Sequence, residues 1–84
     1  MKNYSISIEH KDEAIRLFEK LGYKEDRWWN EVAKHFQNTH ILAYNNGTWG
    51  FFNHNGNGRY SIITIEELRE LVNQTLTPQN THKA

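Results

Sequence analysis

The sequence predicts an α+β domain with elements in the order β-α-α-β-β-β-α, in which an antiparallel meander packs against helices. Residues 4–9 alternate between apolar and polar side chains, which is typical of a half-buried strand. Three further segments carry apolar residues at helical spacing. Residues 40–65 contain three aromatic or β-branched segments separated by Asn-Gly steps. Asn-Gly is a strong hairpin signal because both central residues of the favoured turn need positive φ.

Two helices are expected between the first strand and the meander. The first spans residues 11–21 and ends before Gly22, since glycine adopts positive φ at little cost. The second spans residues 26–37, and the carboxylate of Asp26 is expected to cap its N-terminus. Its apolar residues lie at i, i+4 and i+8, and this stripe is expected to pack on the sheet: Trp28, Val32 and Phe36.

A third helix is expected to begin at residue 64 or 65. Thr64 as N-cap and Glu67 three residues later form a capping box, in which each side chain binds a backbone N–H near the other residue. Pro78 prevents the helix from continuing. The chain is therefore expected to form one domain of residues 1–77, followed by a polar tail of residues 78–84.

The pairing expected within the meander follows from its turns. If Asn46-Gly47 forms a two-residue loop, three pairs result: Tyr44 with Trp49, Leu42 with Phe51, and Ile41 with Phe52. The third strand is expected beside the second, with Phe51 opposite Ile62 or one residue away. Both faces are apolar in either register. The inner face is expected to carry Leu42, Phe51 and Ile62, and the outer face Ile41, Phe52 and Ile63 unless the second helix covers them.

Composition and motifs exclude several kinds of chemistry. The chain has no cysteine, which excludes disulfides and thiolate metal sites. It has five histidines, but a metal site built on His40 and His54 would lack an identified third ligand. No Gly-x-Ser-x-Gly nucleophile motif and no Gly-Lys-Ser/Thr phosphate loop is present. We therefore expect a protein that is not an enzyme and that binds no cofactor and no metal.

The sequence also predicts where the protein acts. It shows neither a secretory signal pattern nor an apolar run approaching the ~18 residues of a membrane span. The absence of cysteine is compatible with a reducing cytosol. We expect a cytoplasmic protein without a membrane partner.

The aromatic residues predict a binding surface. They make up 13% of the chain, while ten basic and ten acidic side chains cancel. Trp and Tyr are enriched among residues that dominate protein interfaces, whereas single-strand nucleic-acid sites need basic flanks, and the meander supplies only Arg59. We expect a protein-binding module, with a single-stranded nucleic-acid binder as the alternative. The candidate binding residues are Trp29, Tyr44, Trp49, Phe52, Arg59 and Tyr60.

Two neighbouring tryptophans and the apolar faces of the sheet bear on how the surface is used. Trp28 and Trp29 point about 100° apart on a helix, so one is expected in the core and the other as a partly exposed anchor. Alternatively, both seal the junction between this helix and the sheet.

A small core, zero net charge and two apolar sheet faces also predict a homodimer.

The order of these signals resembles that of small accessory proteins encoded by phages and prophages. The resemblance rests on the leading strand, the helix and stop of residues 13–23 (EAIRLFEKLGY), the Asn-rich hairpins, and the helix start of residues 63–68 (ITIEEL). It implies an inhibitor or adaptor that binds a host enzyme or a defence factor. The resemblance assigns no functional residue.

Overall fold

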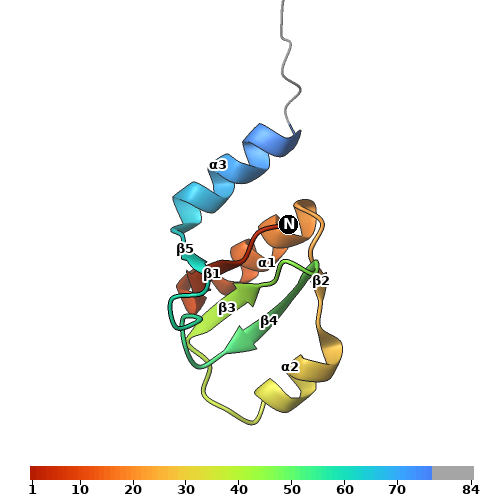
Figure 1. Cartoon of the computed structure of the whole chain (residues 1–84), viewed down its shortest axis with the longest axis vertical. Helices are drawn as coiled ribbons and strands as arrows, with labels where there is room; N and C mark the ends of the chain where they lie inside the picture. The colour runs from red at the N-terminus through yellow and green to blue at the C-terminus, as the bar shows by residue number, and fades with distance from the viewer. Residues whose placement is uncertain (77–84) are drawn as a thin grey trace, which may run out of the picture.

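The computed structural model describes residues 1–76, which form a five-stranded mixed sheet with three α-helices and one 3-10 helix (Figure 1). The elements are β1 (Tyr4–Ser7), the 3-10 helix η1 (Ile8–His10), α1 (Lys11–Lys20), β2 (Lys24–Glu25), α2 (Arg27–Ala33), β3 (His40–Ala43), β4 (Thr48–Phe52), β5 (Ser61–Ile62) and α3 (Ile65–Leu76). This confirms the predicted α+β class, to which η1 and β2 add two short elements. Pro78 and the predicted polar tail lie outside the described residues.

Local signals explain where the helices begin and end. Gly22, with φ of 102°, follows the end of α1 as expected. At the start of α3, the Glu67 N–H donates to Thr64 Oγ1 at 3.1 Å and the Thr64 N–H donates to Glu67 Oε1 at 2.8 Å. The predicted capping box is therefore confirmed. The carboxylate of Asp26 caps α2 by accepting the Trp29 N–H at 3.0 Å, also as predicted.

The sheet has strand order β2-β4-β3-β1-β5. β3 pairs antiparallel with β4 and β1, whereas β5 runs parallel to β1 and β2 parallel to β4. The predicted β3–β4 hairpin is confirmed, but the predicted meander ends there, because β5 pairs with β1 and not with β4. The turn at Asn57-Gly58 closes within the β4–β5 loop, where the Arg59 N–H donates to the Gly56 carbonyl at 3.0 Å. The loop can then carry the chain to the far side of β1.

The β3–β4 turn differs from the expected two-residue loop by one residue. Tyr44 N–H donates to the Thr48 carbonyl at 2.7 Å, and Gly47 N–H donates to the Tyr44 carbonyl at 3.0 Å. With Gly47 at φ of 92°, this is a three-residue loop that ends in a glycine of positive φ. The pairs predicted for Tyr44, Leu42 and Ile41 are therefore wrong; the observed partners are Ala43 with Trp49, Leu42 with Gly50, Ile41 with Phe51, and His40 with Phe52.

This shift exchanges residues between the two faces of the sheet. One face carries Ile41, Ala43, Trp49 and Phe51, and it packs with residues of α1 and α3 in the main core. Further members of this core are Ile6, Ala14, Leu17, Phe18, Ile65, Leu68 and Val72. Phe51 was correctly predicted for the inner face, but the assignment of Ile41 to the outer face is wrong.

The residues found on the opposite face of the sheet also differ from those predicted for it. Leu42 is buried on this second face, and Phe52 lies there as predicted. Ile62, expected inside, is 64% exposed on the edge strand β5. Ile63, expected outside, packs against the main core. The helix next to the second face is α2, which lies at the β4 end of the sheet, away from α3 (Figure 1).

Candidate functional site

Helix α2 and the turn after it leave the two ends of the predicted apolar stripe, Trp28 and Phe36, in solvent, while Val32 is half-buried. Asn30 and Ala33 are the buried residues of this helix, and Trp29 is half-buried against β4. On the other side, Trp28 is 76% exposed and Phe36 is 54% exposed. The expectation that the stripe of Trp28 packs on the sheet is therefore wrong. Trp28, and not Trp29, is the exposed member of the tryptophan pair.

The reversed orientation of α2 has a hydrogen-bonding cause at the edge of β4. Short β2 pairs only with Thr48 and Trp49, so it leaves the backbone of Phe51 without a strand partner on that side. Asn30 Oδ1 accepts the Phe51 N–H at 2.9 Å, and Trp29 Nε1–H donates to the Phe51 carbonyl at 2.7 Å. Two side chains of α2 thus complete the edge of β4, since a buried backbone group needs a partner.

Two exposed side chains, Trp28 and Phe36, and the half-buried Val32 between them form a ridge along α2 and the turn that extends it. We define the α2 ridge as Trp28, Val32 and Phe36. Trp28 and Val32 are neighbours at i and i+4, and Phe36 is held by a turn in which its N–H donates to the Ala33 carbonyl at 2.9 Å. The stripe was visible in the sequence, but periodicity alone does not tell which side of a helix is buried. The site residues Trp28, Val32 and Phe36 were missed for that reason.

The charges that border the α2 ridge largely cancel. Lys34 Nζ lies 2.7 Å from Glu31 Oε1 in an exposed ion pair. This contact lowers the pKa of the Glu31 carboxyl, through the hydrogen bond first and the charge of Lys34 second. Arg27 is exposed on the same helix, and Asp26 precedes it. The ridge is therefore an apolar surface with a mixed, nearly neutral border.

Four predicted binding residues meet in an aromatic cluster on the second face of the sheet. Trp29 stacks on Phe52 with ring centroids 4.8 Å apart, and Phe52 meets Tyr44 edge-on at 5.8 Å. Tyr44 in turn meets Tyr60 at 6.1 Å, and His54 lies beside Phe52 at 5.2 Å. We call Trp29, Tyr44, Phe52, His54 and Tyr60 the aromatic cluster. Its rings pack largely on one another, which supports a structural role.

The other two predicted binding residues, Trp49 and Arg59, lie outside the aromatic cluster. Trp49 is 4% exposed on the core side of the sheet, where it meets Phe51 edge-on at 5.4 Å. Its prediction as a surface anchor is wrong, because Trp49 lies two residues from Phe51 in β4 and therefore shares the inner face that was predicted for Phe51. Arg59 is exposed and follows the turn at Asn57-Gly58.

The electrostatic environment of the aromatic cluster is not basic. Burial is the main cause that raises the pKa of Tyr44, and nearby Tyr60 and Asp26 raise it further. Burial also raises the pKa of Tyr60, with Arg59 acting in the opposite direction. Two lysines that could have added positive charge are engaged with acidic residues elsewhere. Lys34 is paired with Glu31, and Lys24 lines a hollow with Glu19 and Glu25.

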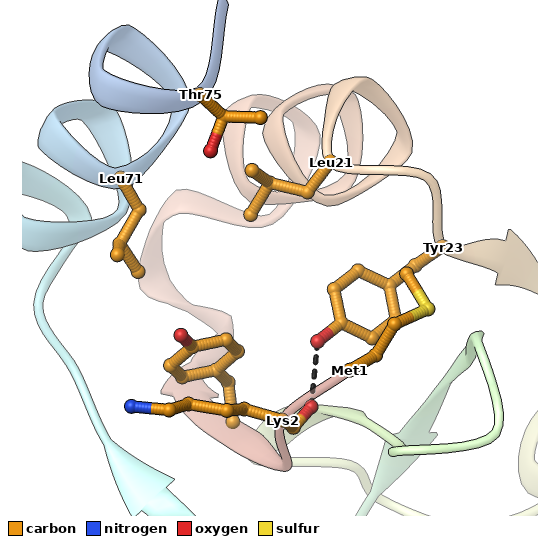
Figure 2. Close-up of a pocket in the computed structure, with 7 residues that line it drawn as sticks. Met1, Lys2, Leu21, Tyr23, Leu71 and Thr75 are labelled. Carbon is orange, nitrogen blue, oxygen red and sulfur yellow. Dashed lines mark hydrogen bonds between the residues drawn. The ribbon is translucent and has the colours of Figure 1, made fainter.

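A separate apolar hollow of about 170 Å³ lies between α3, α1 and β1 (Figure 2). Leu71 and Thr75 of α3 face Leu21 across it, and Tyr23 lies at its floor. The Tyr23 hydroxyl donates to the Lys2 carbonyl at 2.6 Å, so its polar atom already holds the chain that leads into β1. Burial raises the pKa of Tyr23. The other polar side chains that line the hollow are those of Lys2, Tyr4 and Thr75.

Residues 1–76 show neither a metal site nor a membrane-spanning helix. No group of three His, Asp or Glu side chains in this part of the chain is arranged to hold a metal ion. No helix there is both long and apolar enough to cross a bilayer. Comparison of the chain with protein-family models, with curated proteins and with solved structures gives no match.

Proposed function

We propose that this chain is a non-enzymatic, cytoplasmic protein-binding module that docks on its partner through the α2 ridge. The exposure of Trp28, at 76%, carries the proposal. Removal of the apolar surface of an exposed Trp from water is favourable, and Trp is one of the residue types enriched at interface hot spots. The opposite side of α2 is fixed to β4 through Asn30 and Trp29, so the ridge is held ready on a rigid support.

The occupant we propose is a host protein with an apolar groove and a nearly uncharged rim. Trp28 and Val32 at i and i+4 of α2, extended by Phe36 in the following turn, fit the binding mode in which a helix lies in a hydrophobic groove. Because Glu31 and Lys34 neutralise each other beside the ridge, a strongly charged groove would gain little from this surface. The affinity is then expected to change little with salt concentration.

The resemblance to phage and prophage accessory proteins extends this proposal. A small module of this kind would inhibit a host enzyme or a defence factor by covering a surface that the host protein needs. The equal numbers of basic and acidic residues suit a partner that is a protein and not a polyanion.

A single-stranded nucleic-acid binder is the second candidate, favoured only by Arg59 beside the aromatic cluster. Base stacking needs open ring faces together with basic side chains along the strand. In the described residues the Trp29 and Phe52 rings stack on each other, and Tyr44 lies near Asp26 and not near a lysine. This arrangement supports the protein partner over the nucleic acid.

A homodimer stays a prediction, but its original reason has weakened. The uncovered outer face that suggested it is partly covered by α2 and the aromatic cluster. Self-association through the α2 ridge would compete with the partner for the same residues. Light scattering of wild type and Trp28→Ala over a wide concentration range distinguishes the two: a dimer that the substitution dissociates would assign the ridge to a second copy.

The proposal is tested by capture and titration with matched variants. Wild type, Trp28→Ala and the control Ile62→Ala are each used to capture proteins from nuclease-treated host lysate. Ile62 is a suitable control because it is 64% exposed on β5, at a distance from α2 in the fold. We expect one protein that wild type and Ile62→Ala retain and Trp28→Ala loses.

The captured protein is then titrated with each variant at low and high salt. We expect the loss on Trp28→Ala to exceed ~2 kcal/mol, the hot-spot range, at both salt concentrations. Equal capture by Trp28→Ala and wild type would contradict the proposed site. Tight oligonucleotide binding that falls steeply with salt, without a protein partner, would favour the second candidate.

A further inference from the structure

The chain contains three Asn-Gly steps, and these differ in the hydrogen bonding and the exposure of their reacting groups. They are Asn46-Gly47, Asn55-Gly56 and Asn57-Gly58. At such a step the backbone nitrogen of Gly can attack Cγ of the preceding Asn. A C–N bond forms, ammonia leaves with the side-chain nitrogen, and a five-membered succinimide results. Water then opens the ring at either carbonyl, giving aspartate or isoaspartate. A partner for the Gly N–H or for the Asn amide opposes the attack.

Both reacting groups of the Asn46-Gly47 step, the Gly47 nitrogen and the Asn46 side-chain amide, are hydrogen-bonded. The nucleophilic nitrogen is engaged, because Gly47 N–H donates to the Tyr44 carbonyl at 3.0 Å. The electrophilic amide is engaged too, because Asn46 Oδ1 accepts the Thr48 N–H at 3.1 Å and the Thr48 hydroxyl at 2.8 Å. Ring closure here would break the hydrogen bond of Gly47 N–H, and the two bonds to Thr48 hold the Asn46 side chain against rotation toward that nitrogen.

The Asn55-Gly56 step is held in a similar way. Gly56 N–H donates to His54 Nδ1 at 3.0 Å, and Asn55 Oδ1 accepts the Asn57 N–H at 3.1 Å. Gly56 is also buried, and a side chain added there would collide with the ring of Tyr60. The attacking nitrogen is therefore both bonded and confined.

The reacting groups of the Asn57-Gly58 step are less constrained than those of the other two steps. Its two residues have φ of 52° and 83° and form the centre of a turn that Arg59 N–H closes on the Gly56 carbonyl. Among residues 1–76, neither the Gly58 N–H nor the Asn57 side-chain amide has a hydrogen-bond partner. Both residues are exposed, and a Cβ added at Gly58 would meet no heavy atom within 4 Å. There is room for the ring, and no turn hydrogen bond of Gly58 N–H or of the Asn57 side chain must break.

We propose that Asn57 is a site of spontaneous deamidation, with water as the only co-reactant, and that it reacts ahead of Asn46 and Asn55. The product carries a carboxylate beside Arg59, so the formal net charge of the chain falls from zero by one. The isoaspartate product also inserts a methylene into the backbone of the turn. This inference does not depend on the proposed partner.

The test is peptide mapping by mass spectrometry of the intact chain during incubation at mildly alkaline pH. The three steps lie in one molecule and share one dipeptide sequence, so each is a control for the others. We expect the conversion of Asn57 to be about tenfold faster than that of Asn46 or Asn55, since the latter steps must first open hydrogen bonds. In concentrated urea the three rates are expected to converge.

Two variants make the result specific. Asn57→Gln is expected to remove the fast phase, because the larger ring that Gln must form closes slowly. His54→Ala frees the Gly56 N–H and is expected to accelerate Asn55 while leaving Asn46 unchanged. If Asn46 or Asn55 reacted as fast as Asn57 in the folded protein, the proposal would be overturned. An order of rates that persisted unchanged in urea would also overturn it, since the cause would not be the fold.

Discussion

Asn30 Oδ1 accepts the backbone N–H of Phe51 at 2.9 Å, which ties α2 to the edge of β4 through a buried amide. The same side chain donates through Nδ2 to Glu25 Oε2 at 3.1 Å, so it also contacts β2. A polar residue thus determines which side of the helix faces the protein. This relationship explains why Trp28, on the other side of α2, is left in solvent.

Removing this amide is expected to destabilise the domain. Asn30→Ala leaves the Phe51 N–H without a partner in a buried site, which costs about 1–3 kcal/mol. Glu31→Ala on the same helix is the control, because its ion pair with Lys34 is exposed and such pairs contribute little. Urea denaturation followed by tryptophan fluorescence measures both. Equal midpoints for Asn30→Ala and wild type would contradict the role given to Asn30.

The two adjacent tryptophans are expected to respond oppositely to truncation. Trp28→Ala should change the free energy of unfolding by less than about 0.5 kcal/mol, as exposed positions do. Trp29→Ala removes the stack on Phe52 and the hydrogen bond to the Phe51 carbonyl, and should cost at least ~2 kcal/mol. Thermal unfolding of the two variants provides the measurement. A larger loss for Trp28→Ala would mean that the exposed residue had been misassigned.

The capping box of α3 makes a third prediction. Thr64→Ala removes the oxygen that accepts the Glu67 N–H, which should destabilise the domain by about 1 kcal/mol. Thr64→Ser keeps the oxygen and should remain near wild type. The denaturant midpoint at constant slope reports the change. Indistinguishable midpoints for Ala and Ser would show that this bond does not stabilise the helix.

The ion pair between α1 and α3 predicts a pH dependence. Arg69 donates to both oxygens of Glu13, at 2.6 and 2.8 Å, and this hydrogen bond lowers the pKa of Glu13 below its usual 4.5. A carboxyl with a lowered pKa in the folded state contributes stability above about pH 4.5, which is lost as the pH falls through the lowered value.

Both side chains are partly exposed, so the effect should be modest. Arg69→Gln should lower the midpoint of urea denaturation at about pH 7 and should differ less from wild type at about pH 3. A gap between the two proteins that stayed constant over this range would show that Glu13 is not linked to Arg69.

Local signals in the sequence predicted the helix starts and the end of α1 well, whereas α2, predicted to run to residue 37, ends at Ala33. Asp26, Thr64 and Glu67 bind backbone groups within the same turn, and Gly22 adopts its positive φ wherever the rest of the chain lies. Such interactions depend on neighbours in the sequence, so the sequence contains all that determines them. The helix starts, the α+β class and the β3–β4 hairpin follow from this kind of information.

The remaining features depend on contacts between distant residues. The side of α2 that is buried is decided by Phe51, which lies far from Asn30 in the sequence. One residue in the length of the hairpin loop decides that Ile41 and Ala43 share the face of Trp49, where Leu42 and Tyr44 were expected. Of the predicted binding residues, Trp29, Tyr44, Phe52 and Tyr60 come together, but Trp28 was taken for a core residue because periodicity identifies a stripe and not its direction.

The place of β1 in the sheet has a consequence for how the chain folds as it leaves the ribosome. Tyr4 pairs with both Ala43 and Ser61. Strand β1 can therefore complete its pairing only after the β3–β4 hairpin and β5 have been synthesised. Until then its apolar residue Ile6 has no core to enter. Contacts between residues so distant in the sequence slow folding. The nascent chain is therefore expected to form the β3–β4 hairpin early and to complete its sheet only when β5 has been synthesised.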